Sequence, residues 1–178
     1  ISYYKIKHAG LSVARNTGIE VSKSQLVGFI DGDAHAQKYW LKNILNGFRD
    51  PNIAIVSGKV KNLNMANHSF SDLIHNVHFK ASMSIGAASV IGTNMFFSKD
   101  VFTKNSFFID TFSSRGDETF ILRKYLSNNT DKKIYYTDNA VVYNEYPNNI
   151  FAWLMQQYTE GRCSQRINNI LSENKNIV

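Results

Sequence analysis

The chain has 178 residues, a formal net charge of +6 and a hydrophobic fraction of 43%. This length and hydrophobic content suffice for a folded core and exclude wholesale disorder. The one cysteine, Cys163, excludes a disulfide within the chain and agrees with a reducing, cytoplasmic location. No apolar run reaches the roughly 18 residues of a membrane-spanning helix. We therefore expect a single domain over residues 1–178.

Hydrophobic patterning predicts strands that alternate with helices. The run QLVGFI at residues 25–30 is continuously apolar, which is typical of a strand buried on both faces of a parallel sheet. Further strands are predicted at residues 1–7, 52–60, 92–98 and 133–144, and helices at residues 10–23, 37–48, 70–79, 115–128 and 149–171. This alternation indicates an α/β fold with a mostly parallel sheet flanked by helices, followed by a C-terminal helical region over residues 145–178.

Two aspartates, Asp31 and Asp33, follow the run QLVGFI with only a glycine between them. In open α/β sheets, ligands bind at the carboxyl ends of strands. Residues i and i+2 of an extended segment project to the same side, so the two carboxylates repel each other unless a cation lies near them. Mg²⁺ or Mn²⁺, which prefer oxygen ligands, suits this position, especially with a diphosphate. Taken alone, the pattern fits a capped turn equally well, and both interpretations stay open at this point.

A second acidic pair, Asp117 and Glu118, opens a predicted helix. Carboxylates in a first helical turn complement the helix dipole, which is the simplest explanation. Alternatively, one of them is a general base that takes a proton from an attacking hydroxyl. Arg15, in the segment SVARNTG, is either a surface residue or a ligand for a phosphate or carboxylate. The same two interpretations hold for Gln157 and Arg162 near the C-terminus.

Several common chemistries find no support in the sequence. It contains no P-loop, Gly-X-Ser-X-Gly or Gly-X-Gly-X-X-Gly motif, and its histidines lack zinc-binding spacing. Four other segments carry a family resemblance: GLSVARNTGIEVSKSQLVGFIDGDAHAQKYWL, IGTNMFFSKDVF, FFIDTFSSRGDETFILRKY and AVVYNEYPNNIFAWLMQQYTEGR. In this order and spacing they resemble the family 2 glycosyltransferases of the GT-A fold, over nearly the whole chain.

The resemblance implies a transferase that moves a sugar from a nucleoside diphosphate sugar to an acceptor hydroxyl, with inversion at the anomeric carbon. It assigns Asp31 and Asp33 to a Mn²⁺ or Mg²⁺ ion that bridges to the donor diphosphate. Glu118 takes the position of the base. The usual order in the family is Glu-Asp, however, so Asp117 is also a candidate.

The resemblance also implies donor contacts and a third metal ligand. Arg15 is expected on the donor side, and Gln157 with Arg162 near the diphosphate or the acceptor. Many relatives have a metal-binding histidine after the strand that matches AVVYN. Here Asn144 and Glu145 are the candidates to replace it through a side-chain oxygen. The family begins with further strands that hold the nucleotide base and have no counterpart here. We therefore expect an N-terminally incomplete GT-A domain that binds a donor poorly, with inactivity as a second outcome.

The expected acceptor is a glycan, a lipid-linked compound or another hydroxyl compound, as in glycan or polysaccharide biosynthesis. Scattered basic residues suit anionic ligands or an anionic membrane surface, so peripheral membrane contact is a further expectation, and no nucleic acid partner is expected. Two alternatives stay open. One is another metal-dependent nucleotide enzyme, such as a nucleotidyltransferase. The other is a non-catalytic module that uses the basic, aromatic-bearing C-terminal helix on a membrane surface or nucleic acid.

Overall fold

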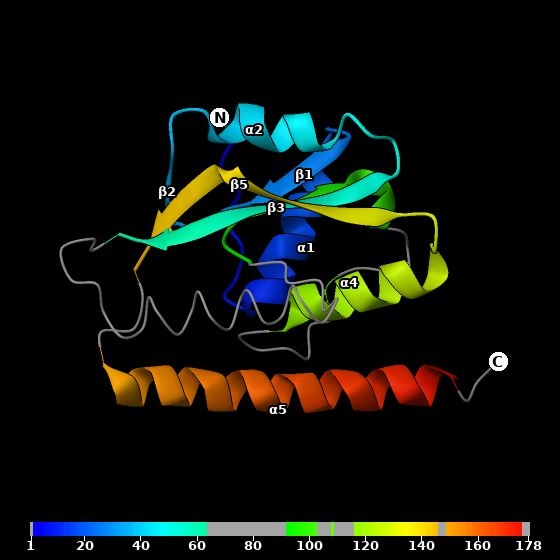
Figure 1. The fold of residues 1–178 in the computed structure, drawn as a ribbon. Coiled ribbons are helices and arrows are strands. Elements are labelled where there is room, and N and C mark those ends of the chain that lie inside the picture. Colours follow the sequence, from blue (N-terminus) through cyan, green and yellow to red (C-terminus); the bar gives the residue numbers. More distant parts are fainter. Residues whose placement is uncertain (1, 64–91, 103–107, 109–115, 146–148, 176–178) are drawn as a thin grey trace.

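The computed structural model describes residues 2–63, 92–102, 108, 116–145 and 149–175. Strands and helices alternate along the chain (Figure 1), which confirms the predicted α/β class. No helix among the described residues combines the length and hydropathy needed to cross a bilayer. The elements in chain order are α1 (Leu11–Val21), β1 (Leu26–Phe29), β2 (His35–Ala36), α2 (Trp40–Gly47), β3 (Ile53–Asn62), β4 (Met95–Ser98), the 3-10 helix η1 (Lys99–Val101), α4 (Asp117–Asn128), β5 (Lys133–Asn144) and α5 (Ile150–Lys175).

The sheet has the strand order β1-β4-β3-β5-β2. Among the described strands, β3 and β5 alone pair in parallel, whereas the pairs β1/β4, β3/β4 and β2/β5 are antiparallel. The described sheet is therefore mixed, which corrects the expectation of a mostly parallel one. A turn closed by a hydrogen bond from Ala34 N–H to Asp31 O reverses the chain after β1. Since β1 and β5 run in the same direction, this reversal leaves β2 antiparallel to its partner β5.

Three further predictions change. Residues 2–9 form neither helix nor strand, so the strand predicted at residues 1–7 is wrong over its described part. Strand β1 lies at the edge of the described sheet, and of its residues only Val27 is buried. Its apolar run therefore does not mark a strand covered on both faces. The two-residue strand β2 was not predicted, because two residues show no periodicity. The helix expected at residues 70–79 lies outside the described residues.

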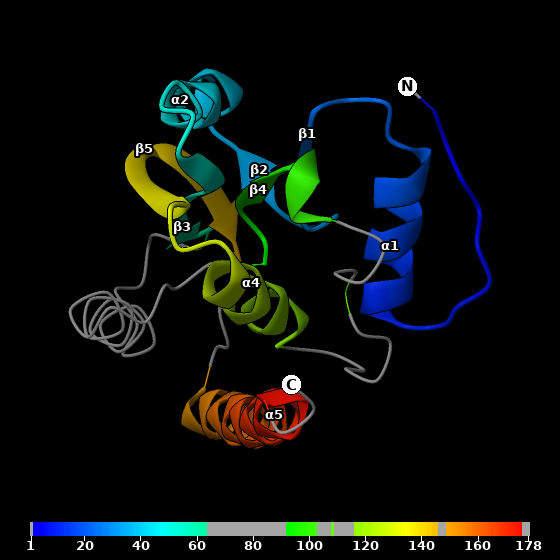
Figure 2. The same ribbon diagram turned by 90° about the vertical axis from the view of Figure 1, so that its right-hand side faces the viewer.

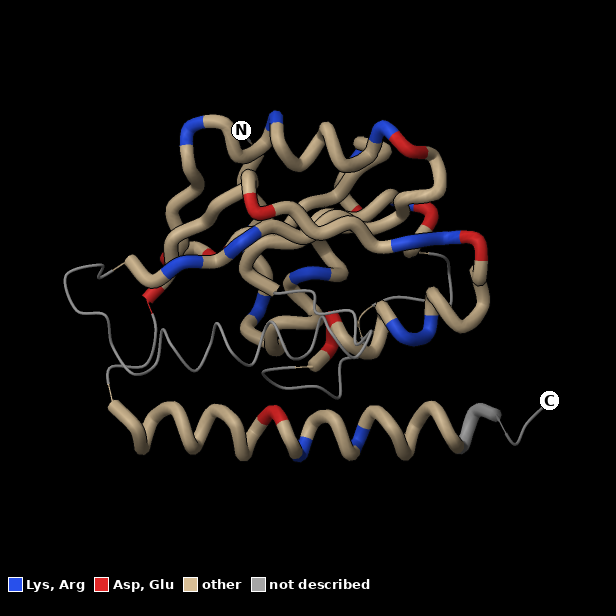
Figure 3. Tube along the Cα trace, viewed as in Figure 1, with Lys and Arg blue, Asp and Glu red and all other residues tan. Residues whose placement is uncertain are grey.

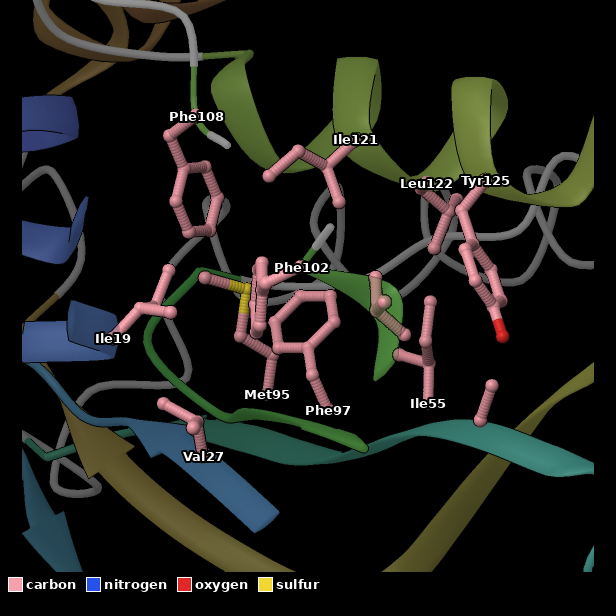
Figure 4. Packing of buried hydrophobic residues seen from close by; sticks show 12 residues of the cluster. Ile19, Val27, Ile55, Met95, Phe97, Phe102, Phe108, Ile121, Leu122 and Tyr125 are labelled. Carbon is pink, nitrogen blue, oxygen red and sulfur yellow. The ribbon is translucent and has the colours of Figure 1, made fainter. Parts of the chain in front are cut away.

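Helices cover both faces of the sheet: α2 lies on one face, α1 and α4 lie on the other, and α5 lies beyond α4 (Figures 1 and 2). Alternate side chains of the central strands point to opposite faces of the sheet and pack in different clusters. Ile55 and Phe97 belong to the cluster shared with α1 and α4 (Figure 4), while Val56 and Phe96 belong to the cluster under α2. A smaller cluster joins α4 to α5 through Phe120 and Ile167, Ile170 and Leu171. These layers bring the N-termini of α1 and α4 toward one end of the sheet.

Candidate active site

Helix α1 presents polar side chains to the interior. Its buried positions are Ser12, Arg15 and Ile19, which share one face at a spacing of three and four residues. Two apolar residues of this helix, Leu11 and Val21, are exposed instead. A buried arginine and serine on a helix face need polar partners, because burial of an unpaired charge is costly. Those partners lie in α4.

The buried partner of Arg15 is Asp117, the first residue of α4. Arg15 Nη1 lies 2.7 Å from Asp117 Oδ1, and Ser12 Oγ donates to Asp117 Oδ2 at 3.1 Å. The guanidinium also lies 5.8 Å from the ring centroid of Phe29 and 5.3 Å from that of Phe108. Arg15 is 7% exposed and Asp117 is 1% exposed. Arg15 is thus held by an ion pair and two aromatic rings, and no described contact joins it to Asp31 or Asp33.

Glu118 is the more accessible carboxylate of the pair. Its side chain is 19% exposed, and Oε2 lies 3.5 Å from Arg15 Nη1. Its backbone N–H donates to Asp117 Oδ1 at 3.0 Å, which helps to fix the neighbouring carboxylate. Gly116, whose φ of 88° lies in the left-handed region, precedes the pair at the helix start. Of the two carboxylates, Glu118 is therefore the one that a ligand can reach.

The environments of the two carboxyls separate their pKa values. Burial is the largest influence on Asp117 and by itself raises its pKa, but hydrogen bonds from Glu118, Arg15 and Ser12 and the charge of Arg15 outweigh it, so the pKa is lowered. Burial, followed by the hydrogen bond to Asp117 and its negative charge, raises the pKa of Glu118 to about 8. Near neutral pH the pair holds one negative charge, on Asp117, and one proton, on Glu118.

A single short segment, Gly92-Thr93-Asn94, connects this pair to the first aspartates. A Cβ atom at Gly92 would lie 2.7 Å from Arg15 Nη2 and 3.5 Å from Glu118 Oε1, so the backbone passes directly against the acidic pair. The next residue, Thr93, donates its hydroxyl proton to Asp31 Oδ2 at 2.5 Å. Of two adjacent residues in one segment, Thr93 thus bonds to Asp31 and Gly92 lies beside Arg15 and Glu118. The structure therefore brings Asp31 and the pair Asp117–Glu118 to one site, although 86 residues separate Asp31 from Asp117 in sequence (117 − 31).

Asn94 anchors this segment. Its side-chain Nδ2 donates to the backbone oxygens of Ala140 at 2.9 Å and of Lys59 at 3.0 Å, and its Oδ1 accepts from Trp40 Nε1 at 2.9 Å. Asn94 itself has an exposed fraction of 0%. These bonds tie the segment to β3, β5 and α2 at once. The position of Thr93 is consequently set by the packed interior rather than by the loop alone.

The two aspartates lie on a turn rather than on an extended segment. The hydrogen bond from Ala34 N–H to Asp31 O closes it at 3.1 Å, which corrects the expectation that the carboxylates project together from an extended chain. Asp31 is half-buried and Asp33 is exposed. Neither forms an ion pair with another described residue, and the described part of the chain contains no group of three or more His, Cys, Asp or Glu side chains that could hold a metal.

Residues with neutral oxygens complete the surroundings of Asp31. Asn144, at the end of β5, donates from Nδ2 to Thr93 Oγ1 at 3.4 Å, so Asp31, Thr93 and Asn144 form a chain of contacts. The other oxygen candidate, Glu145, is exposed, and its backbone N–H donates to Asn144 Oδ1 at 2.8 Å. Carboxylate, hydroxyl and amide oxygens are the donors that Mg²⁺ and Mn²⁺ prefer. The donor set therefore fits a hard divalent cation by its chemistry.

The structure places Gln157 and Arg162 on α5, without a described contact to Asp31 or Glu118. Gln157 Nε2 donates to Glu160 Oε2 at 3.4 Å. Arg162 is exposed, and its guanidinium lies 5.9 Å from the ring centroid of Tyr158. Both contacts lie within the helix itself. The expectation that these two residues reach a diphosphate or an acceptor stays a prediction.

Sequence reasoning did not single out Ser12, Gly92 or Thr93. Ser12 lies three residues before Arg15, which is the spacing of one helix face and the available signal for a shared partner. Gly92 and Thr93 belong to the segment IGTNMFFSKDVF, which entered only as part of a pattern. Thr93 donates to a residue 62 positions away, and Gly92 lies beside Arg15 and Glu118 of two other elements, so local spacing does not reveal these relationships.

Comparison with known proteins identifies the family of this chain. The model of the family described as "Glycosyl transferase family group 2" matches residues 26–159. A pre-mycofactocin glycosyltransferase of Mycobacterium tuberculosis (strain CDC 1551 / Oshkosh) is 35% identical over 54 residues, which cover 30% of this chain and 12% of that protein.

Two solved structures share the fold. A mannosyltransferase from Pyrobaculum calidifontis, in complex with GDP-Man and Mn²⁺, has a TM-score of 0.61 at 16% identity, and the match covers 81% of this chain and 39% of that one. Glucosyl-3-phosphoglycerate synthase from Mycobacterium tuberculosis, in complex with Mn²⁺, UDP-glucose and phosphoglyceric acid, has a TM-score of 0.60 at 13% identity. The match covers 87% of this chain and 55% of that one. The predicted GT-A fold is therefore confirmed. This chain spans about half the length of these structures or less.

Proposed function

Because this chain belongs to glycosyl transferase family group 2, we propose that it carries the cation site and the base of a glycosyltransferase that uses a nucleoside diphosphate sugar. The observation that carries the proposal is the position of Gly92, where even a Cβ atom would crowd Arg15 and lie 3.5 Å from Glu118, next to the bond from Thr93 to Asp31. A sugar transferase needs a cation for the leaving diphosphate close to a base for the acceptor. One backbone segment supports both groups here.

Asp31 and Asp33 are the carboxylate ligands in this proposal, with Asn144 as a further oxygen ligand and Thr93 as the residue that orients Asp31. The bound Mn²⁺ or Mg²⁺ would neutralise the charge that develops on the departing nucleoside diphosphate. The similar mannosyltransferase and glucosyl-3-phosphoglycerate synthase were solved with Mn²⁺ and a nucleotide sugar, which supports this choice of ion and donor. The absence of an ion pair at either aspartate among the described residues supports it further.

Glu118 is the base in this proposal. In a direct displacement, the acceptor oxygen forms a bond to the anomeric carbon while the bond from that carbon to the diphosphate oxygen breaks. The electron pair leaves with the diphosphate, and the hydroxyl proton passes to the Glu118 carboxylate. Asp117 is buried, bonded to Ser12 and Arg15 and only 1% exposed, so it cannot meet an acceptor. The geometry thus favours Glu118 over Asp117, and this one-step course gives inversion.

Arg15 has a different role in this proposal from the donor contact that the resemblance implied. Its guanidinium is paired with Asp117 and lies near two aromatic rings, so it has little surface for a phosphate. Its charge helps to lower the pKa of Asp117, and burial together with the ionised Asp117 raises the pKa of Glu118. Arg15 is therefore a positioning residue. The sugar, the nucleotide and the acceptor are not specified by these contacts.

The test is Mn²⁺-dependent binding of UDP and GDP to this chain, measured by calorimetry. We expect binding that needs the ion and that Asp31→Asn and Asp33→Asn each weaken by at least about tenfold, because each variant removes a charged ligand. The matched control is Asp138→Asn, since Asp138 is an exposed carboxylate paired with Lys59 on the surface. Equal ion-dependent binding by the wild-type chain and both site variants would contradict the proposal.

A further inference from the structure

An apolar stripe runs along the exposed side of the first half of α5. Phe151, Leu154, Met155 and Tyr158 follow the spacing i, i+3, i+4 and i+7, which places them on one helix face. They are 75%, 49%, 64% and 62% exposed, respectively. Four large side chains exposed side by side mark an interaction surface more strongly than scattered ones do.

The opposite side of α5 is the one that packs on the domain. Ile167 is 1% exposed and clusters with Phe120 of α4. A Cβ atom at Gly116 would lie 3.0 Å from the Cβ of Cys163, so α5 also abuts the start of α4. Residues 163 and 167 lie about a third to half a turn from the stripe. The stripe therefore points away from α4 and the sheet, along the outermost helix in Figures 1 and 2.

The charges of α5 are segregated in the same way. Arg162 and Arg166 continue the face of the stripe at intervals of four residues after Tyr158, and both are exposed. Glu160 is the single acidic residue between positions 149 and 172. It accepts hydrogen bonds from Gln156 and Gln157, away from the stripe. Figure 3 shows how sparse charges are along α5 compared with the rest of the chain.

We propose that this face of α5 rests on an anionic lipid surface. Phenylalanine, leucine, methionine and tyrosine side chains enter the boundary between headgroups and acyl chains, and the arginines meet the anionic headgroups. A second copy fits the charges less well. It would add its own arginines to a face that already carries Arg162 and Arg166, and like charges repel. The proposal does not depend on sugar transfer.

The experiment is co-sedimentation of this chain with vesicles of phosphatidylcholine alone and of phosphatidylcholine mixed with phosphatidylglycerol. We expect binding to the mixed vesicles that weakens as salt is added. The double substitution Phe151→Ser/Met155→Ser should reduce it by about tenfold or more. Arg162→Gln and Arg166→Gln should each reduce it by about fivefold. All these side chains are exposed, so unchanged thermal unfolding should accompany each variant.

The matched control is Leu41→Ser/Leu45→Ser, because these leucines of α2 are 49% and 45% exposed and also lie four residues apart. We expect this control to bind vesicles like the wild-type chain. Three results would each overturn the proposal: no binding by the wild-type chain, equal binding to vesicles without anionic lipid, or an equal loss in the α2 control. Concentration-dependent dimerisation that Phe151→Ser/Met155→Ser abolishes, without a change in vesicle binding, would assign the face to a second copy instead.

Discussion

Arg15 Nη1 lies 2.7 Å from Asp117 Oδ1, and both side chains are buried. The pair joins the first helix of the chain to the first turn of α4, 102 residues later. A buried ion pair stabilises a fold only weakly compared with well-packed apolar groups, but loss of one partner leaves a buried charge without compensation. This asymmetry distinguishes the pair from an ordinary surface contact, and it leads to the first prediction.

Replacement of one partner should destabilise the domain more than replacement of both. Asp117→Asn removes the nearer acidic partner of the buried Arg15 and leaves only Glu118, 3.5 Å away, so we expect the free energy of unfolding to fall by about 3 kcal/mol. The double variant Arg15→Met/Asp117→Asn also removes the arginine charge, so its free energy of unfolding should fall less. Urea unfolding measures both. Asp138→Asn, at a surface pair whose carboxylate is 68% exposed, serves as the control with little change expected. A double variant as unstable as the sum of its single variants would contradict the coupling.

The rate of sugar transfer should rise with pH through the pKa of Glu118. The base form is the carboxylate, and burial beside Asp117 raises this pKa to about 8. Below that pH the group holds its proton, so the rate should fall about tenfold per pH unit; above it, the rate should level off. Initial rates of donor consumption, measured over about two pH units on either side of this pKa, give the profile.

The matched variant for that profile is Glu118→Gln, whose amide N–H can replace the carboxyl O–H toward Asp117. We expect the rate to fall by about 100-fold or more and the limb near pH 8 to disappear, while nucleotide binding persists. Asp138→Asn should keep the full profile. A limb that persists in Glu118→Gln would assign the titration to another group.

Gly92→Ala should lower activity through the position of Arg15. The added methyl group would lie 2.7 Å from Arg15 Nη2, and Arg15 is too buried to move aside freely. We expect a loss of about 1–3 kcal/mol in stability, with a lower rate of transfer. Gly18→Ala in α1 is the control, because its added Cβ meets nothing within 4 Å and alanine favours a helix by about 1 kcal/mol. Equal stability changes in both variants would refute the crowding at Gly92.

Thr93→Val should weaken cation binding without unfolding the protein. Valine keeps the shape of threonine but loses the hydroxyl that donates to Asp31 and accepts from Asn144. Loss of a residue that orients a metal ligand typically costs about 10- to 100-fold in affinity. Titration of Mn²⁺ by electron paramagnetic resonance measures it, and Thr93→Ser should restore most of the affinity. If Thr93→Val and the wild-type chain bind Mn²⁺ equally, Thr93 does not orient the site.

Much of the secondary structure followed from local patterns. The helical spacing of residues 37–48 predicts α2, because a helix that buries one face repeats its apolar residues every three to four positions. The apolar run at residues 52–60 predicts β3, because a strand buried on both faces is apolar throughout. The mixed sheet did not follow, since strand direction depends on the connections. The run at residues 25–30 is as apolar as that of β3, yet β1 lies at the edge of the described sheet. The hydrophobic content of a strand indicates that it is buried, but it does not predict which strands lie beside it in the sheet.

The sequence by itself determined the inventory of the site: two aspartates after a strand, an acidic pair at a helix start, and the order of motifs that indicates the family. Only the tertiary structure decided the roles of these residues. It paired Arg15 with Asp117, left Glu118 partly buried with a raised pKa, and linked Asp31 to the neighbourhood of the acidic pair through Gly92 and Thr93. The physical reason is that charge, burial and pKa depend on distances between side chains, and folding sets these between segments far apart in the chain.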